Sequence, residues 1–193
     1  NLGSNNWKAT WTTTGTDTEV VVTFTIDYSD LANNAGAQVT STTDASSVLF
    51  DRTKPSNETA VDTGTWTNNA QLSFTWPATT ETGSGVDYYK FYLNTSASHT
   101  TPVPFINGTN IGNVLTYTLT SGEAALLSSG TQYFGKIRAI DKAGNVQTSG
   151  GNWTDGITLD QSLPTSTIIS PVTGGFYKAS TWPGSISGTA ADT

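Results

Sequence analysis

Residues able to do acid–base chemistry are few in this chain of 193 residues, and they are widely spaced. His99 is the only histidine, and it lies in a polar stretch with no acid or nucleophile beside it in sequence. A catalytic histidine needs a partner that positions it. One histidine without any cysteine also cannot assemble a zinc site. We therefore interpret His99 as a surface loop residue.

Paired carboxylates are the other candidates for catalysis, because glycosidases use two of them on either side of the scissile bond. The candidates are Glu81 with Asp87, and Glu123 by itself. They lie in predicted turns, where acidic side chains are common for structural reasons. We therefore assign no catalytic residue and predict that the chain is not an enzyme.

Four aspartates raise the question of calcium. Asp30 and Asp141 lie in two similar turns, and Asp51 and Asp160 lie in two similar linkers. Calcium takes about six to eight oxygen ligands, usually from several converging carboxylates, and would stiffen the joints between domains. The alternative is that each aspartate accepts hydrogen bonds from N–H groups of its own turn. The density of acids along the chain is low, which favours the second interpretation, so we expect no cofactor and keep calcium as the alternative.

The sequence also contains four N-glycosylation sequons, each with the pattern Asn-x-Ser/Thr. All four fall in predicted loops or linkers. Their asparagines are the candidate modification sites: Asn57, Asn94, Asn107 and Asn152.

A dense group of aromatic side chains suggests a surface that binds sugars. Tyr88, Tyr89, Phe91 and Tyr92 lie within one predicted strand, 86–93. Successive side chains of a strand point to opposite faces, so two of these rings face outward unless residues 94–113 cover them. Because large rings usually dominate cores, we favour the interpretation of core plus cover over a binding platform.

Charge and composition exclude several classes of function. The net charge of −7 and the scattered cations argue against nucleic acid, which needs clustered Lys and Arg. No apolar run reaches the roughly 18 residues of a membrane span. The absence of Cys and Met removes oxidisable side chains, which fits an extracellular location. Abundant Thr and aromatic residues favour β-structure.

The stretch 126–145 is the clearest structural signal. A turn at Ser128–Gly130 precedes an alternating strand that should place Tyr133, Ile137 and Ala139 on one face, and a second turn follows at 141–145. This pattern is typical of a late strand in a small β-sandwich. A similar ending occurs at 20–34, after an alternating run that predicts a half-buried strand.

Further alternating runs predict the other strands, and residues 94–113 between two of them read as a long polar excursion. The predicted strands lie at 38–50, 72–76, 115–119, 156–160, 167–169 and 185–190. Pro-containing linkers at 51–55 and 160–164 divide the chain, because proline restricts the backbone and ends pairing. We therefore predict all-β tandem antiparallel sandwiches over residues 1–53, 54–163 and 164–193, with only the middle unit complete.

The middle unit resembles a fibronectin type III domain of the kind found in tandem in prokaryotic surface and secreted proteins. Trp76 stands at the core tryptophan of that family's second strand, and Leu126 or Leu127 at the leucine before its sixth strand. Tyr133 stands at its tyrosine corner. The run 139–145 is also similar, whereas the excursion at 94–113 departs from the pattern.

The flanking pieces resemble parts of prokaryotic Ig-like domains. Residues 1–53 are similar to the C-terminal part of such a domain, and 164–193 to its N-terminal part. The resemblance implies a structural or adhesive segment of a cell-surface or secreted protein, such as an adhesin, an S-layer protein or a filament. The alternative function is a carbohydrate-binding or accessory module of a secreted carbohydrate-active enzyme.

The resemblance also implies the partners. These are neighbouring domains of the same longer chain, other copies of the protein, and a surface glycan or protein ligand, with no nucleic acid and no membrane insertion. Because two half-sandwiches would expose apolar faces, we expect the native chain to continue beyond both ends. In a less favoured alternative, the C-terminal strands of one copy complete the N-terminal half of the next.

Overall fold

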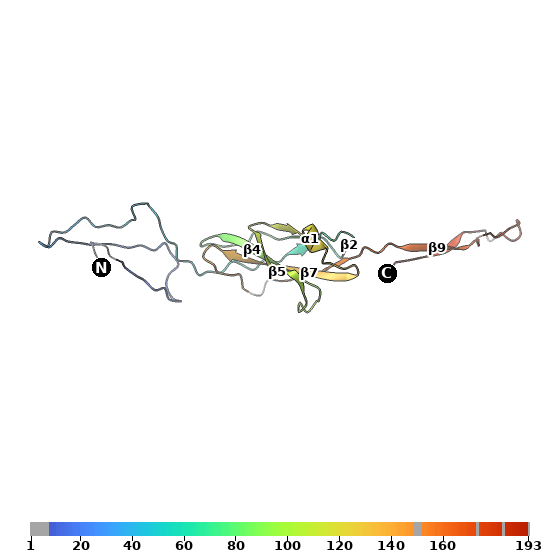
Figure 1. Ribbon diagram of the computed structural model, residues 1–193, viewed down its shortest axis with the longest axis horizontal. Coiled ribbons are helices and arrows are strands. Elements are labelled where there is room, and N and C mark those ends of the chain that lie inside the picture. The colour runs from blue at the N-terminus through green and yellow to red at the C-terminus, as the bar shows by residue number, and fades with distance from the viewer. Residues whose placement is uncertain (1–7, 149–151, 173, 183, 193) are drawn as a thin grey trace.

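The computed structural model describes residues 8–148, 152–172, 174–182 and 184–192. The chain is almost entirely β-structure and runs as three parts along one long axis (Figure 1). We call them the N-terminal segment (8–53), the middle unit (54–163) and the C-terminal segment (164–192). None of the described helices is long and apolar enough to cross a membrane.

The middle unit is a sandwich of two sheets. The smaller sheet has the order β1-β3-β6, and the larger has the order β2-β8-β7-β4-β5. All neighbours pair antiparallel except β2 and β8, which are parallel. The strands are β1 (Val61–Asp62), β2 (Trp66–Thr67), β3 (Ser73–Thr75), β4 (Val86–Asn94), β5 (Pro102–Gly112), β6 (Thr116–Thr118), β7 (Thr131–Asp141) and β8 (Ile157–Leu159). This order agrees with the fold that the fibronectin type III resemblance implies.

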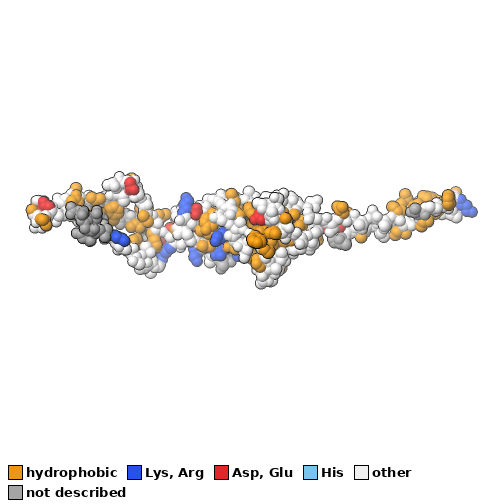
Figure 2. Space-filling view, in the orientation of Figure 1, with side chains coloured by type: hydrophobic (Ala, Val, Ile, Leu, Met, Phe, Trp, Pro, Cys, Tyr) orange, Lys and Arg blue, Asp and Glu red, His pale blue; other side chains and the backbone are white. Residues whose placement is uncertain are grey.

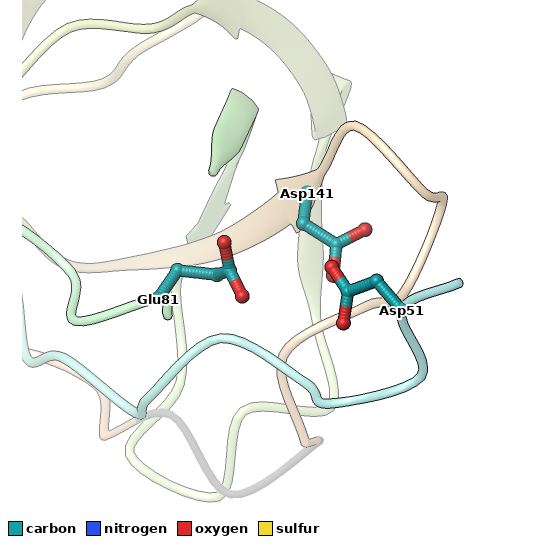
Figure 3. A group of neighbouring side chains, drawn as sticks. All are labelled: Asp51, Glu81 and Asp141. Carbon is teal, nitrogen blue, oxygen red and sulfur yellow. The ribbon is translucent and has the colours of Figure 1, made fainter. Parts of the chain in front are cut away.

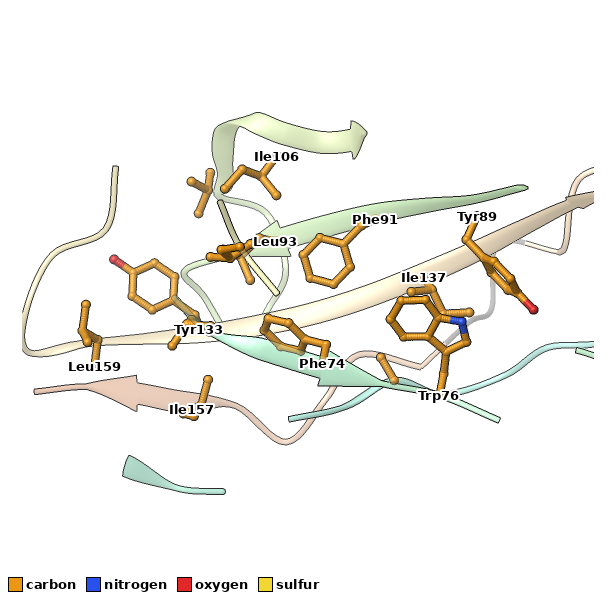
Figure 4. Packing of buried hydrophobic residues seen from close by; sticks show 14 of the residues in the cluster. Phe74, Trp76, Tyr89, Phe91, Leu93, Ile106, Tyr133, Ile137, Ile157 and Leu159 are labelled. Atoms are coloured by element: carbon orange, nitrogen blue, oxygen red, sulfur yellow. The ribbon is translucent and has the colours of Figure 1, made fainter. Parts of the chain in front are cut away.

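Strand alternation fills the core between the two sheets. On β7, Tyr133, Ile137 and Ala139 are buried, which confirms the predicted inward face. From the opposite sheet, Phe74 of β3 packs on Phe91 of β4 with ring centroids 4.9 Å apart (Figure 4). Among the described residues, every buried hydrophobic side chain lies between positions 60 and 159, so the core belongs to the middle unit.

A short helix, α1 (Ser121–Ala124), leads into the predicted tyrosine corner. Thr120 and Glu123 form a capping box, and the Tyr117 hydroxyl donates to the Glu123 carboxylate at 2.7 Å. The Tyr133 hydroxyl then accepts a hydrogen bond from the backbone N–H of Ser128 at 2.7 Å. Glu123 is therefore a structural residue that fixes the entry to β7.

The interpretation of residues 94–113 as a polar excursion is wrong, because most of this stretch is strand β5. β5 pairs with β4, but register shifts interrupt the pairing at several places. Pro102, Pro104 and Gly108 weaken the strand signal, since proline lacks an N–H donor and glycine lacks a side chain to pack. The shifts also break the period-two alternation by which a strand is recognised.

The N-terminal segment differs from its prediction as well. Instead of continuous strands at 20–28 and 38–50, it forms only isolated bridges: Val21 with Leu49, Ile26 with Val39, and Ser29 with Ala35. Most of its large apolar side chains stay exposed, because no second layer lies over them within the described part of the chain. The space-filling view shows such side chains on the surface of both end segments (Figure 2).

The C-terminal segment is a hairpin of β9 (Thr165–Ser170) and β10 (Ser187–Ala191), close to the two predicted strands. Its side chains are exposed almost throughout. A two-stranded hairpin by itself is marginally stable in water, so this segment gains little from burial.

Candidate functional site

The two similar turns are built in the same way, and their aspartates bind their own turns. Asp30 accepts hydrogen bonds from the backbone N–H groups of Ala32 and Asn34 and from the Asn34 side chain. Asp141 accepts from the backbone N–H and the side chain of Asn145. The predicted hydrogen bonding within each turn is therefore confirmed.

Asp141 has two acidic neighbours that come from other parts of the chain. One carboxylate oxygen of each of Asp51, Glu81 and Asp141 lies within 4.8 Å of the others. Asp51 comes from the first linker, Glu81 from the loop before β4, and Asp141 from the end of β7 (Figure 3). Asp51 is 8% exposed and Asp141 only 1% exposed, so two of the three carboxylates are buried.

Each of the six carboxylate oxygens in this cluster accepts a hydrogen bond. The Asp51 oxygens accept from the backbone N–H groups of Thr53 at 3.1 Å and Ser84 at 2.7 Å. The Glu81 oxygens accept from the N–H groups of Gly83 and Gly85. The backbone N–H and the side-chain amide of Asn145 donate to the two Asp141 oxygens. Such bonds compensate much of the cost of burying the carboxylates.

The electrostatics of the cluster follow from these bonds. Burial alone would raise the pKa of Asp51, but hydrogen bonds from Ser84 and Thr53 outweigh burial and hold this pKa below its usual range. A lowered pKa stabilises the folded state above the pKa of the unfolded chain, near 3.8. This contribution is lost as the pH falls through the folded pKa.

The cluster offers hard oxygen ligands of the kind that calcium prefers, and it is denser than the sequence indicated. Each of its oxygens nevertheless already accepts a hydrogen bond from the protein, and three carboxylates supply at most six oxygens, the lower end of what calcium takes. Our expectation is unchanged: adding chelator should shift the melting temperature little. A shift of many degrees that saturates with added calcium would show that these carboxylates are ligands.

The arrangement joins the first linker to the middle unit. The Asn145 side chain donates to the backbone carbonyl of Asp51 at 3.2 Å, and the Ala143 N–H donates to the Ser84 hydroxyl at 3.1 Å. On the other side of Asp51, Arg52 forms an ion pair with Glu19 at 3.4 Å. We call the contacts of Asp51, Ser84 and Asn145 the first joint.

Sequence reasoning named two acids of this cluster as calcium candidates, but it did not predict that the three acids lie together. It named Asp51 and Asp141, but it paired Glu81 with Asp87, which is exposed and outside the cluster. Asp30 and Asp160 are also outside it, and Asp160 accepts from the N–H of Ser162 in its own linker. The convergence depends on the fold bringing three distant loops together, for which a single sequence carries no signal.

His99 lies in the loop between β4 and β5, which confirms the prediction of a loop residue, but its side chain is half-buried. Its ring stacks on Trp153 with centroids 4.6 Å apart and planes 4° apart, and it contacts Phe134 edge-on. Lys136 lies over the Trp153 ring, with its Nζ 5.3 Å from the centroid. Burial and the Lys136 charge lower the pKa of His99.

The aromatic strand divides as alternation requires. Tyr89 and Phe91 are buried in the core, whereas Tyr88 and Tyr92 lie half-buried on the opposite face of the sheet. β5 does not cover these two rings as a separate layer, since it extends the same sheet beside β4. Tyr88 and Tyr92 therefore face outward, and the predicted cover by residues 94–113 is limited to Gly108, which lies against the Tyr92 ring.

The four sequons differ in accessibility, and two are not in loops. Asn94 ends β4, is 2% exposed, and its side-chain oxygen accepts from the N–H groups of Ser96 and Thr101. This asparagine is thus inaccessible to a glycan. Asn107 lies within β5 and is exposed, as are Asn57 and Asn152. Glycosylation of these three stays a prediction.

Comparisons with known proteins add little beyond the fold. No protein-family model and no curated protein matches the chain. A solved structure described as an Fn3-like protein from Clostridium thermocellum matches at 18% identity with a TM-score of 0.31. The match covers 56% of this chain and 92% of that one. We draw no functional argument from it.

Proposed function

We propose that the chain is a structural segment of an extracellular surface protein or filament, in which the middle unit is a spacer between neighbouring domains. The chain enters the middle unit at one end and leaves it at the other, so that tension applied to the two ends would pass through the whole sandwich (Figure 1). The proposal includes an adhesive or assembly role for the complete protein, in contact with other copies or with a ligand.

The observation that carries this proposal is the first joint. Asp51 is bonded on one side to Ser84 and Asn145 of the middle unit, and its neighbour Arg52 is bonded to Glu19 of the N-terminal segment. A linker held from both sides cannot swivel freely, as a Gly/Ser linker does. A fixed joint is what a spacer needs to hold its neighbours apart.

Assembly through the β5 edge of the middle unit is disfavoured by the features of this strand. β5 is an edge strand with two prolines and several register shifts, and natural proteins use these features to block pairing with another chain. Phe105 on this strand is 87% exposed with a φ of 66°, which takes the backbone out of the strand conformation. We expect contacts with other copies away from this edge, for example through the exposed apolar side chains of the end segments.

Small-angle scattering of the chain tests the fixed joint. We expect an elongated particle, and we expect the double variant Asp51→Ala, Asn145→Ala to give a shorter mean dimension and a broader distribution, because the linker is released. The matched control is Asp155→Ala, which removes an exposed charge away from the joint. Equal scattering from the parent, the double variant and the control would contradict the proposal.

Location at the cell surface has its own test. Protease added to intact source cells should cleave the protein while a cytoplasmic marker stays whole. Full protection from protease until the cells are lysed would overturn the extracellular assignment.

A second candidate function is carbohydrate binding, as in an accessory module of a secreted carbohydrate-active enzyme. The observation that favours it is the outward position of Tyr88 and Tyr92, whose rings offer faces on which sugars stack. Binding of an oligosaccharide that is lost on replacing Tyr92 by alanine would support this function, and a glycan screen without a single binder would contradict it.

A further inference from the structure

The outward face of the five-stranded sheet carries cations as well as tyrosines. We define the basic face by five half-buried side chains: Tyr88, Lys90, Tyr92, Lys136 and Arg138. In the register of β4 and β7, Tyr92 lies opposite Lys136, and Lys90 lies opposite Arg138. Along β4, a cation thus stands between two aromatic rings on one face.

The pairing of Lys90 with Arg138 does not help the fold. Like charges directly opposite each other on a sheet are destabilising. Among the described residues, neither Lys90 nor Arg138 forms an ion pair that would relieve the repulsion. Burial together with the charge of Arg138 lowers the pKa of Lys136, as expected at a locally positive surface. Stability therefore does not account for the pairing of Lys90 with Arg138.

Arg138 is held in place by a hydrogen bond to the neighbouring backbone. Its Nη2 donates to the backbone carbonyl of Gln147 at 2.9 Å, whereas its buried Nε has no hydrogen-bond partner in the described structure. A surface hollow of about 420 Å³ lies beside it, lined by Lys54, Arg138 and residues 144–148. Lys54 and Arg138 therefore border a space large enough for a carboxylate group, and Lys90 does not line it.

Carboxylates of the protein itself stay at the ends of this face. Along β4, β5 and β7 the acidic residues are Asp87 and Asp141, near one end of the sheet, and Asp141 is already bonded to Asn145. The centre of the face is therefore positive in a chain whose net charge is −7. That overall charge opposes any polyanion, so binding of one would have to come from local contacts at this face.

We propose that the basic face binds a linear polysaccharide that carries carboxylate groups, an inference that rests on the second candidate function. Tyr88 and Tyr92 would stack on sugar rings, and Lys90 and Arg138 would bind carboxylates between them. Arginine matches a carboxylate with two parallel N–H donors, and in this half-buried setting weaker screening by water strengthens their attraction while loss of hydration opposes it. The polysaccharide carries carboxylates spaced along its chain, and the basic face carries cations spaced along its strands.

Titration of the chain with a hexamer of galacturonic acid, in the presence of chelator, tests the inference. The matched neutral probe is the hexamer of galactose. We expect the acidic hexamer to bind more tightly than the neutral one and its affinity to fall as salt is added. Lys90→Gln and Arg138→Gln should each weaken binding about fivefold, the order expected for one partly exposed ion pair.

Lys178→Gln is the matched control variant, because it removes the same charge from the C-terminal segment. It should bind like the parent chain. Lys90→Gln should in addition unfold at the same or a slightly higher denaturant concentration, because it removes a like-charge pair. A lower unfolding midpoint would contradict the repulsion on which the inference depends.

Several outcomes overturn the inference in distinguishable ways. If both hexamers bound with equal affinity and Lys90→Gln did not change it, the chain would bind carbohydrate. The proposed preference for carboxylate groups would then be wrong. Absence of binding to either hexamer would contradict both. Equal weakening by Lys178→Gln would show unspecific attraction, and tighter binding of DNA or anionic vesicles would point to a different polyanion.

Discussion

Phe24 of the N-terminal segment and Phe91 of the middle unit both stand in regular alternating runs of apolar and polar residues. Phe91 is completely buried, whereas Phe24 is 39% exposed. The middle unit places a second sheet over the apolar face of the first, and the described part of the N-terminal segment has no such layer. An alternating pattern puts the apolar side chains of a strand on one face. The strand forms only where a second layer packs on that face.

The two regions nevertheless contain turns of the same construction, at residues 30–34 and 141–145. In each turn the aspartate N–H donates to the carbonyl of the asparagine four positions later, in the pairs Asp30 with Asn34 and Asp141 with Asn145. A residue with positive φ precedes that asparagine, Asn33 in one turn and Gly144 in the other. Local hydrogen bonding thus forms without a core, whereas continuous strand pairing does not.

The largest expected effect comes from removing a ring in each region. Phe91→Ala should lower the free energy of unfolding by about 3–5 kcal/mol, since it leaves a cavity in a closed core. Phe24→Ala should change it by less than about 0.5 kcal/mol, as for most surface substitutions. Urea unfolding followed by tryptophan fluorescence measures both, and equal losses would refute the contrast between the two regions.

A smaller difference in the free energy of unfolding is expected between two tyrosines whose hydroxyls accept the same kind of hydrogen bond. The Tyr133 hydroxyl accepts from the N–H of Ser128, and the Tyr177 hydroxyl accepts from the N–H of Val172, in each case five residues earlier. Tyr133 is buried, so Tyr133→Phe leaves a donor without a partner and should cost about 1–3 kcal/mol.

Tyr177→Phe is the control for that bond. Its surroundings in the C-terminal segment are exposed, so water replaces the hydroxyl and the cost should stay below about 0.5 kcal/mol. If Tyr177→Phe proved the more destabilising of the two, the C-terminal segment would have to contribute to a core of its own.

The smallest expected effect concerns His99, where a loop packs on the middle unit. NMR titration of this single histidine should give a pKa below the usual value of about 6.5. Because the folded state disfavours the charged ring, this contribution to stability is complete above the unfolded pKa and decreases as the pH falls through it. Trp153→Ala should move the pKa upward by exposing the ring, and an unshifted pKa in the parent chain would contradict the packing.

Much of the middle unit was predictable because its signals are local. Period-two alternation located β4 and β7, and the resemblance of Tyr133 and its surroundings to fibronectin type III domains predicted the tyrosine corner. β5 was missed because prolines and register shifts erase the alternation that marks a strand. The stacking of His99 on Trp153 was missed because those residues are distant in sequence.

The candidate site likewise combines local features, which were predictable, with long-range contacts, which were not. Hydrogen bonds from a turn to its own aspartate follow from local residue types, and those at Asp30 and Asp141 were expected. The meeting of Asp51, Glu81 and Asp141 needs the linker, the loop before β4 and the end of β7 to be folded together. Spacing along one sequence does not encode that meeting, so the first joint became visible only in the structure.

Hydrogen exchange on the chain of residues 1–193 tests most directly whether the core is confined to the middle unit. We predict that backbone amides of β4 and β7 exchange only through global unfolding, and that those at 20–50 and 165–191 exchange orders of magnitude faster through local opening. Slow exchange of equal extent in all three parts would show that the end segments hold cores of their own, and would contradict the account.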